Sequence, residues 1–454
     1  MKAHKILIFI LSVIVLLGIL CSFFPEGGVQ VGGMSLEFPS IEDILIGDDA
    51  LPEAEDPEVL IARREAAIKE ARKNDFLTYF SIDPARIYFP DDDISYLDGF
   101  FEALENAMDK PFRIMHYGDS QIEEDRISSV LRDSLQTRFG GGGPGLLPVR
   151  EKYYTYSISE SSTVEPRRYM IYGTADMHGG NSRYGIMGQR FHFDTTVTST
   201  FSAVKSNLGP SRYFNKATLL SSGGAIYVSC KGQSQKLPAS EEVRHVRFQL
   251  PDSTTRVSIT HSGSHDVYGI MLDNDRGVSL DNIPMRGCSG TIFTGISSAQ
   301  LRDYFTKENV RLIILQYGGN VVPYTKTEKS ISQYKTSIEK QIAHIKKEAP
   351  GTMILFIGPS DMSTNIQGKM QTYKQLPMIV DSLKAAVLNS GAAFWDMYSA
   401  MGGEGSMVKW VKSNPPLAGS DYVHFTPKGA QEMGGILYES LMLYYDYYKL
   451  RKDD

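Results

Sequence analysis

Short apolar runs that alternate with helical segments constrain the fold of this chain more than any other feature. Three such runs lie in the second half of the sequence, at 311–317, 353–357 and 392–397. Stretches with helical spacing of apolar residues separate them, at 329–347 and 376–388. Apolar strands joined by amphipathic helices are typical of a parallel sheet covered by helices on both faces. The sequence therefore predicts an α/β fold, with functional groups at the carboxyl ends of the strands.

The middle of the chain has a different pattern. Residues 152–281 contain strand-like runs such as AIYVSC, VRHVRFQL, TRVSITHS and VYGIML, with turn residues between them and little helical periodicity. This pattern predicts an all-β domain of the β-sandwich kind, inserted into the α/β domain. The α/β domain would then have two parts, 93–151 and 282–454.

The N-terminal segment is strongly apolar. Lys2 and Lys5 precede an apolar run from Ile6 to Phe24, and about twenty such residues suffice to cross a bilayer as a helix. With the basic flank inside, the remaining chain would be extracytoplasmic, on the periplasmic or cell-envelope side. We expect residues 1–24 to be an uncleaved signal anchor; a cleaved signal peptide is the alternative. Residues 25–92 read as an acidic spacer followed by a helical stalk.

Composition excludes some partners. The formal net charge of -6, without a basic cluster, argues against nucleic acid as a partner. The three cysteines, Cys21, Cys230 and Cys288, are not at metal-ligand spacing. His261 and His265 have no carboxylate at such spacing either, so we expect no metal. A Cys230–Cys288 disulfide and the oligomeric state stay open.

A candidate nucleophile lies early in the chain. Gly118, Asp119 and Ser120 follow a short apolar strand and precede a helical stretch at 122–135. A serine there has its hydroxyl at the carboxyl end of a strand, and the positive end of the helix would stabilise an oxyanion. Taken alone, the same tripeptide is more typical of a helix cap than of a nucleophile.

A candidate base and its partner lie near the other end. Asp421 and His424 are three residues apart, before a helix that starts near Thr426 and Pro427. This spacing lets the carboxylate bind the imidazole Nδ1–H, which leaves Nε2 free to take a serine proton. Together with Ser120, these residues predict a catalytic triad. The G-x-S-x-G elbow of α/β-hydrolases does not occur around Ser120.

With these motifs the chain resembles the SGNH (GDSL-like) hydrolases, a family defined by four sequence blocks. The blocks correspond here to Gly118–Ser120, Gly287, Gly318–Asn320 and Asp421–His424. The resemblance implies a flavodoxin-like three-layer α/β/α domain and no cofactor. It also implies an oxyanion hole formed by the Ser120 N–H, the Gly287 N–H and the Asn320 amide.

Two details of this resemblance are open. Gly290 could take the place of Gly287. Val321 stands where the family often has an acid, which leaves the Asn320 donor intact but puts the surrounding hydrogen bonds in doubt. Asp361, after the run at 353–357, either lines the pocket or caps the next segment.

The position of the β insert adds a functional expectation. Bacterial peptidoglycan O-acetylesterases are similar in layout, with a β-sandwich, carbohydrate-module-like insert between the first two blocks. This likeness implies a serine esterase of the cell envelope that removes O-acetyl groups from a polysaccharide, foremost peptidoglycan. Three alternatives remain: an O-acetyltransferase with the same triad, a noncatalytic envelope-glycan binding protein, and a lipase-like long-chain esterase.

Overall fold

The computed structural model describes residues 3–23, 29–31, 34–36, 70, 72–151 and 153–452. The chain divides into two compact units, Met1–Asn74 and Asp75–Asp454.

The described residues of the first unit include a helix and a pair of short strands. Helix α1 spans Ala3–Phe23, and strands β1 (Val29–Val31) and β2 (Met34–Leu36) pair in antiparallel fashion. No helix in the described part of the chain combines the length and the apolar character needed to cross a membrane. The transmembrane helix expected at 1–24 is therefore not found. Most of the expected spacer and stalk lies outside the described residues.

The second unit is built on a six-stranded sheet with the order β16-β4-β17-β18-β21-β3. The first five strands are parallel, and β3 adds an antiparallel edge. In chain order the parallel strands read 2-1-3-4-5, the order of flavodoxin-like sheets. The strands are β3 (Ile87–Tyr88), β4 (Phe112–Gly118), β16 (Val278–Pro284), β17 (Val310–Gln316), β18 (Met353–Ile357) and β21 (Ala393–Trp395).

Helices cover both faces of this sheet. Successive strand residues point to opposite sides, so apolar side chains lie on both faces and are buried under helices. On β17, Leu312 and Ile314 belong to one buried core, and Ile313 and Leu315 to the other. The first core also contains residues of α4, α5 and α11, and the second residues of α6, α7 and α8. The α/β prediction is confirmed. The helices are α4 (Asp98–Glu105), α5 (Ser128–Phe139), α6 (Ser298–Lys307), α7 (Glu328–Glu348), α8 (Leu376–Asn389), α9 (Met397–Ala400), α10 (Ser406–Lys412) and α11 (Pro427–Lys452).

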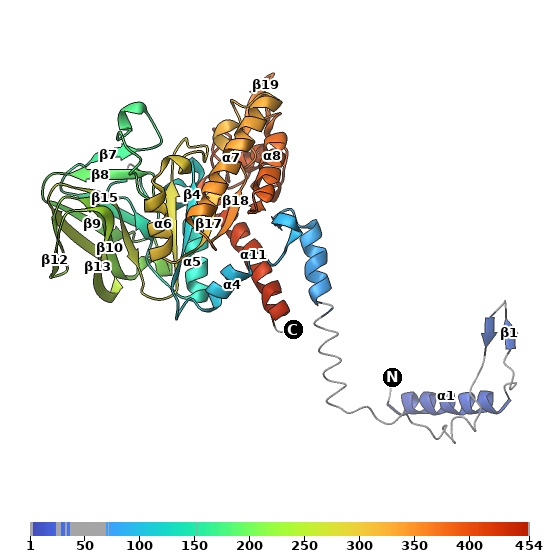
Figure 1. Ribbon diagram of the computed structural model, residues 1–454. Coiled ribbons are helices and arrows are strands. Elements are labelled where there is room, and N and C mark those ends of the chain that lie inside the picture. The colour runs from blue at the N-terminus through green and yellow to red at the C-terminus, as the bar shows by residue number, and fades with distance from the viewer. Residues whose placement is uncertain are drawn as a thin grey trace. The chain divides into compact units, whose positions relative to one another are not determined.

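Two antiparallel sheets lie beside this α/β part (Figure 1). Their orders are β13-β10-β15-β8-β7, with β5 on β15, and β12-β11-β14-β9-β6. Apolar residues of both sheets, such as Phe248 of β13 and Phe201 of β9, share one core. The strands are β5 (Gly145–Leu147), β6 (Ile158–Ser162), β7 (Arg167–Met170), β8 (Gln189–Phe193), β9 (Val197–Ala203), β10 (Phe214–Gly223), β11 (Ile226–Cys230), β12 (Gln233–Leu237), β13 (Ser240–Thr254), β14 (Arg256–Ser262) and β15 (His265–Asp273). A small hairpin, β19 (Ser363–Ile366) and β20 (Lys369–Thr372), follows β18.

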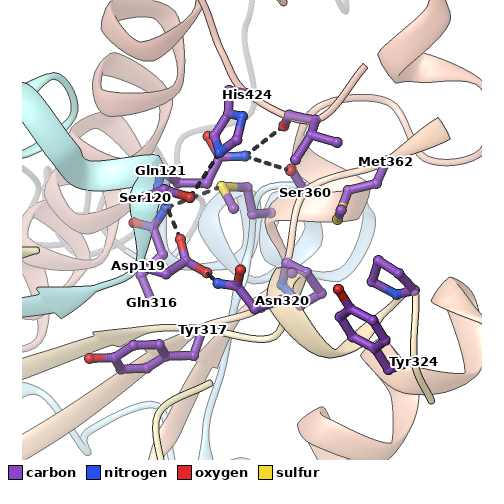
Figure 2. Close-up of a pocket in the computed structure, with 16 residues that line it drawn as sticks. Asp119, Ser120, Gln121, Gln316, Tyr317, Asn320, Tyr324, Ser360, Met362 and His424 are labelled. Carbon is purple, nitrogen blue, oxygen red and sulfur yellow. Dashed lines mark hydrogen bonds between the residues drawn. The ribbon is translucent and has the colours of Figure 1, made fainter. Parts of the chain in front are cut away.

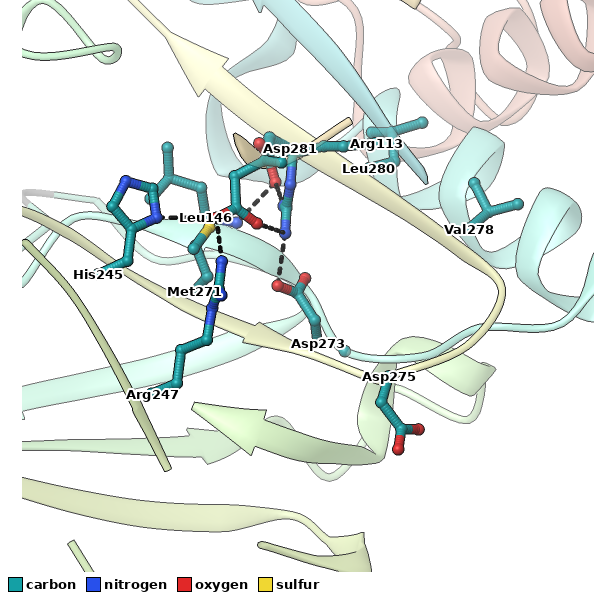
Figure 3. A network of polar contacts seen from close by, with 12 residues as sticks. Arg113, Leu146, His245, Arg247, Met271, Asp273, Asp275, Val278, Leu280 and Asp281 are labelled. Atoms are coloured by element: carbon teal, nitrogen blue, oxygen red, sulfur yellow. Dashed lines mark hydrogen bonds and ion pairs between the residues drawn. The ribbon is translucent and has the colours of Figure 1, made fainter. Parts of the chain in front are cut away.

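A buried ionic network connects the parallel sheet to these antiparallel strands (Figure 3). Arg113 of β4 forms ion pairs with Asp273 at the end of β15 and Asp281 in β16. All three side chains are almost fully buried. The Tyr304 hydroxyl donates to the second Asp281 oxygen at 3.0 Å. The network therefore holds strands of both sheets at their junction.

Candidate active site

Ser120 lies at the carboxyl end of the central strand β4. A 3₁₀ segment, Ser120–Asp125, follows the strand, and the Asp119 carboxylate caps it by accepting the Gln121 N–H at 3.0 Å. Backbone angles at Glu123 and Glu124 are not helical, and α5 begins only at Ser128. The helix expected at 122–135 thus starts later than predicted. A short 3₁₀ segment, and not an α-helix N-terminus, is present at the candidate nucleophile.

The structure brings the three predicted triad residues together, as Figure 2 shows for Ser120 and His424. The Ser120 Oγ lies 2.8 Å from His424 Nε2. His424 Nδ1 lies 2.7 Å from Asp421 Oδ2. Asp421 and His424 are on the loop before α11. Ser120 is 304 residues away from His424 in the sequence. The arrangement permits the serine proton to pass to an imidazole that a carboxylate orients.

Local hydrogen bonds hold Asp421 in its ionised form. Burial acts to raise the pKa of this carboxyl, but hydrogen bonds from the His424 ring and from the backbone N–H groups of His424 and Val423 outweigh it. The pKa of Asp421 is therefore below its ordinary value. The two backbone bonds, of 3.0 and 3.1 Å, reach Oδ1 and leave Oδ2 to the imidazole.

Asn320 joins the site from the neighbouring strand. Strand β17 ends at Gln316, and Gly318 adopts φ 123°, a conformation that favours glycine, to begin the turn Gly319–Val321. The Asn320 Nδ2 lies 2.8 Å from Asp119 Oδ2 and 3.1 Å from the Cys288 carbonyl oxygen. Both amide hydrogens thus have acceptors, with which a substrate oxyanion would have to compete.

Asp119 has an unusual environment for a carboxyl group. It is buried, and burial raises its pKa to about 6, although hydrogen bonds from Gln121 and Asn320 and the nearby His424 act in the opposite direction. Through these hydrogen bonds Asp119 holds both the turn that carries Ser120 and the side-chain amide of Asn320.

Gly287 is not brought into the pocket. It lies in the turn after β16 with φ 74°, where the Cys288 N–H donates to the Met285 carbonyl at 2.9 Å, and it is not among the pocket-lining residues. Gly290, with φ 80°, packs so closely on the Tyr317 ring that a Cβ would lie 2.7 Å from it. This turn reaches the site through the Cys288 carbonyl. The role of Gly287 stays a prediction.

Ser120 and His424 line a cavity of about 200 Å³ (Figure 2). One wall is formed by residues at the end of β17 and just after it, and the other by residues just after β18. Most of these wall residues carried no recognisable sequence signal, because only folding aligns the two strand ends. The lining residues are Asp119, Ser120, Gln121, Gln316, Tyr317, Gly319, Asn320, Pro323, Tyr324, Gly358, Pro359, Ser360, Met362, Met397, Val423 and His424.

Other residues considered in the sequence are not among those that line this cavity. Asp361 is buried and accepts the Met407 N–H at 2.8 Å, so it caps the start of α10. His261 and His265 contact each other, with 2.8 Å between Nδ1 and Nε2. Cys230 and Cys288 are free and buried, so the disulfide left open in the sequence is not formed. Among the described residues, no group of three or more His, Cys, Asp or Glu side chains is placed to hold a metal ion.

Comparisons with known proteins identify the fold. No protein-family model matches the chain, and no curated protein matches its sequence. Among solved structures, a peptidoglycan O-acetylesterase aligns with a TM-score of 0.63 at 18% identity, over 80% of this chain and 96% of the other. A family two carbohydrate esterase from Clostridium thermocellum in complex with cellohexaose aligns at 10% identity over 58% and 96%, with a TM-score of 0.27. A family two carbohydrate esterase from Cellvibrio japonicus aligns at 12% identity over 64% and 99%, with a TM-score of 0.25.

The first of these alignments covers most of both chains. The chain therefore shares the fold of this peptidoglycan O-acetylesterase, and it resembles that protein as its motifs predicted.

Proposed function

We propose that this protein is a serine esterase that removes O-acetyl groups from a cell-envelope polysaccharide, foremost peptidoglycan. The observation that carries the proposal is the hydrogen-bonded series Ser120–His424–Asp421, with distances of 2.8 and 2.7 Å. The shared fold with a peptidoglycan O-acetylesterase supports the substrate class.

The reaction would proceed by two acyl transfers. His424 takes the Ser120 proton while the Ser120 Oγ attacks the acetyl carbonyl carbon, and Asp421 stabilises the imidazolium. The tetrahedral intermediate collapses as His424 donates that proton to the leaving sugar oxygen. Water, deprotonated by His424, then attacks the acetyl-serine, and acetate leaves when Ser120 regains its proton.

Oxyanion stabilisation would come from donors that converge beside Ser120. The Ser120 N–H lies at the strand end, and the Asn320 amide lies in the same cavity. On substrate binding, the oxyanion would replace one of the two acceptors of the Asn320 Nδ2 group. Each such donor contributes about 3 kcal/mol to the transition state in comparable sites. Gly287 would contribute only if its turn approached the cavity.

Two features of the cavity suit a short acyl group on a sugar. A volume of about 200 Å³, shared between acyl group and attached alcohol, favours acetyl over a long chain. The Tyr324 side chain lies at the rim and is 82% exposed, so its ring is free to pack on a sugar face. The lipase-like alternative lacks comparable support.

Solvent access favours hydrolysis over transfer to a second sugar. The side chains of His424 and Asp421 are 37% and 51% exposed, so water can reach the base. A transferase needs water to be excluded from the acyl-enzyme. The noncatalytic alternative would leave the hydrogen-bonded triad without a purpose. A polymeric envelope substrate implies an extracytoplasmic location, which fractionation of cells would test.

The decisive variant is Ser120→Ala. We expect it to lower the turnover of p-nitrophenyl acetate and the release of acetate from O-acetylated peptidoglycan by at least about 10³-fold, because no nucleophile remains. Ser337→Ala, at a partly exposed serine of α7, is the matched control. Unchanged activity in Ser120→Ala would exclude the proposed mechanism, and transfer products in place of acetate would favour the transferase.

A further inference from the structure

Something must hold the histidine loop against the serine turn, because the two segments are far apart in sequence. Within its own loop, His424 is well fixed: the Gly419 N–H donates to the His424 carbonyl at 2.8 Å, and Asp421 binds the His424 ring and N–H. These bonds orient the imidazole relative to Asp421. None of them determines the distance from His424 to Ser120.

Arg126 spans this gap with three hydrogen bonds. Its Nη2 donates to the Ser120 carbonyl oxygen at 2.8 Å and its Nη1 to the Phe425 carbonyl oxygen at 3.1 Å. Its Nε donates to the Glu123 carbonyl oxygen at 3.0 Å. The side chain is only 11% exposed, and its nearest recorded carboxylate, of Glu124, lies 3.8 Å away. The planar guanidinium therefore joins the backbone of the nucleophile to that of the residue after His424.

Gln121 holds the other side of His424. Its Nε2 donates to the Val423 carbonyl oxygen at 2.7 Å, and its Oε1 lies 3.5 Å from the Phe425 N–H. The side chain is 8% exposed. Gln121 and Arg126 thus bind the carbonyl groups on both sides of His424, and both come from the segment that begins with Ser120.

The backbone between Gln121 and Arg126 makes a tight turn. Glu124 and Asp125 adopt φ values of 63° and 66°, which are uncommon for residues with a side chain. Arg132 of α5 holds the second of them through two hydrogen bonds, of 2.6 and 3.0 Å, to the Asp125 carboxylate. The turn is therefore fixed in a conformation that returns Arg126 to the Ser120 carbonyl.

We propose that Arg126 and Gln121 form a clamp that sets the distance between Ser120 and His424, and that both are positioning residues for proton transfer. The inference rests on the proposed function. Because Asp421 and His424 belong to one loop, release of the clamp would move that pair as a unit. Proton transfer from Ser120 to His424 would become slower, whereas the pH at which the imidazole titrates would stay the same.

The test compares Arg126→Ala with Arg126→Lys, Gln121→Glu and the control Arg138→Ala. Arg138 is an arginine of α5 that pairs with Asp446 on the surface. With p-nitrophenyl acetate, we expect Arg126→Ala to lower kcat by about 10²-fold, since a displacement near 1 Å has that effect. KM and the pH midpoint of kcat/KM should stay at wild-type values. The kcat of Arg126→Lys should lie between those of wild type and Arg126→Ala, because lysine can bind fewer of the three carbonyls. Added guanidinium should restore part of the activity that Arg126→Ala loses.

Hydrogen exchange supplies a readout besides activity. Amides of the loop at 419–426 should exchange faster in Arg126→Ala and Gln121→Glu than in wild type and Arg138→Ala. Wild-type kcat and exchange in Arg126→Ala, or a loss with a shifted pH midpoint, would overturn the clamp. If Arg126→Ala does not fold, the hydrogen-exchange comparison of Gln121→Glu with wild type carries the test. Failure of the proposed function would differ: wild type itself would hydrolyse no ester and take up no fluorophosphonate at Ser120, while the exchange comparison would still judge the clamp.

Discussion

At the scale of single residues, environment separates the roles of two neighbouring carboxylates. Asp421 is half exposed and accepts three hydrogen bonds within its loop, and these lower its pKa despite partial burial. Asp119 is buried beneath the serine, and burial raises its pKa to about 6. Asp421 is thus the carboxylate suited to stabilise an imidazolium, whereas Asp119 supports backbone and amide donors.

Tyr324 provides a residue-scale test of the substrate class. Its ring is 82% exposed, but its backbone is anchored, because the Tyr324 N–H donates to the Val321 carbonyl at 3.0 Å. If the ring packs on a sugar, Tyr324→Ala should raise KM for O-acetylated peptidoglycan by roughly 10-fold and leave p-nitrophenyl acetate kinetics unchanged. Tyr324→Phe should behave as wild type, and Tyr79→Ala, exposed elsewhere, is the control. Equal effects on both substrates would argue against a sugar contact.

At the scale of elements, strand β4 leads into the proposed nucleophile, and both of its faces are buried. Every residue of β4 is buried, and Gly118 pairs with Gln316 on one side and Pro284 on the other. The strand even includes an imidazole: His116 is fully buried, with Nε2 3.1 Å from Gln316 Oε1 and Nδ1 2.8 Å from Ser128 Oγ. Such a group is stable only when neutral.

The buried imidazole predicts a loss of stability in acid. Burial lowers the pKa of His116 from 6.5 to about 4. Because the folded state disfavours the proton, the neutral form contributes fully above about pH 6.5, and stability falls as pH decreases from there towards 4, by roughly 3 kcal/mol. Denaturant unfolding of wild type and His116→Gln between pH 7 and pH 4 should show a shallower decline in the variant. His178→Gln, in an exposed turn, is the control, and parallel curves for wild type and His116→Gln would refute this assignment.

At the scale of the whole second unit, one buried network joins the parallel sheet to the antiparallel strands. Arg113 lies between Asp273 and Asp281 (Figure 3). Glu308 extends the network to β13, because it lies 2.8 Å from His245 Nδ1 and 3.0 Å from Arg247 Nη2. The charges of Arg113, Asp273 and Asp281 at this junction are shielded from water, whereas Arg247 at the edge of the network is 52% exposed.

Removal of one partner should therefore be costly. Arg113→Leu leaves two buried carboxylates without their cation, and we expect it to lower the free energy of unfolding by about 3–5 kcal/mol. Arg138→Leu breaks a surface ion pair and should lower it by about 1 kcal/mol or less. Chemical denaturation followed by circular dichroism measures both. If Arg113→Leu lowers the free energy of unfolding only as much as Arg138→Leu does, the network is not a determinant of stability.

Some features of this protein were accessible from the sequence because they are local. Apolar runs and helical spacing predict a parallel α/β sheet, since strand and helix periodicity depend on neighbouring residues alone. Asp421 and His424 are three residues apart, so their contact is a property of one loop. Glycine, aspartate and serine after a strand likewise place the candidate nucleophile at the strand end.

Other features were decided only by tertiary structure, because they depend on packing between distant segments. The approach of Ser120 to His424, the position of Gly287 outside the cavity and the separate, free Cys230 and Cys288 are of this kind. So are the contacts of Arg126, whose three acceptors are backbone carbonyls that no residue type reveals. A sequence specifies side chains, whereas a carbonyl acquires its partner only when the chain has folded. For this reason the candidate triad could be proposed from the residues, but the contacts that hold its parts together could not.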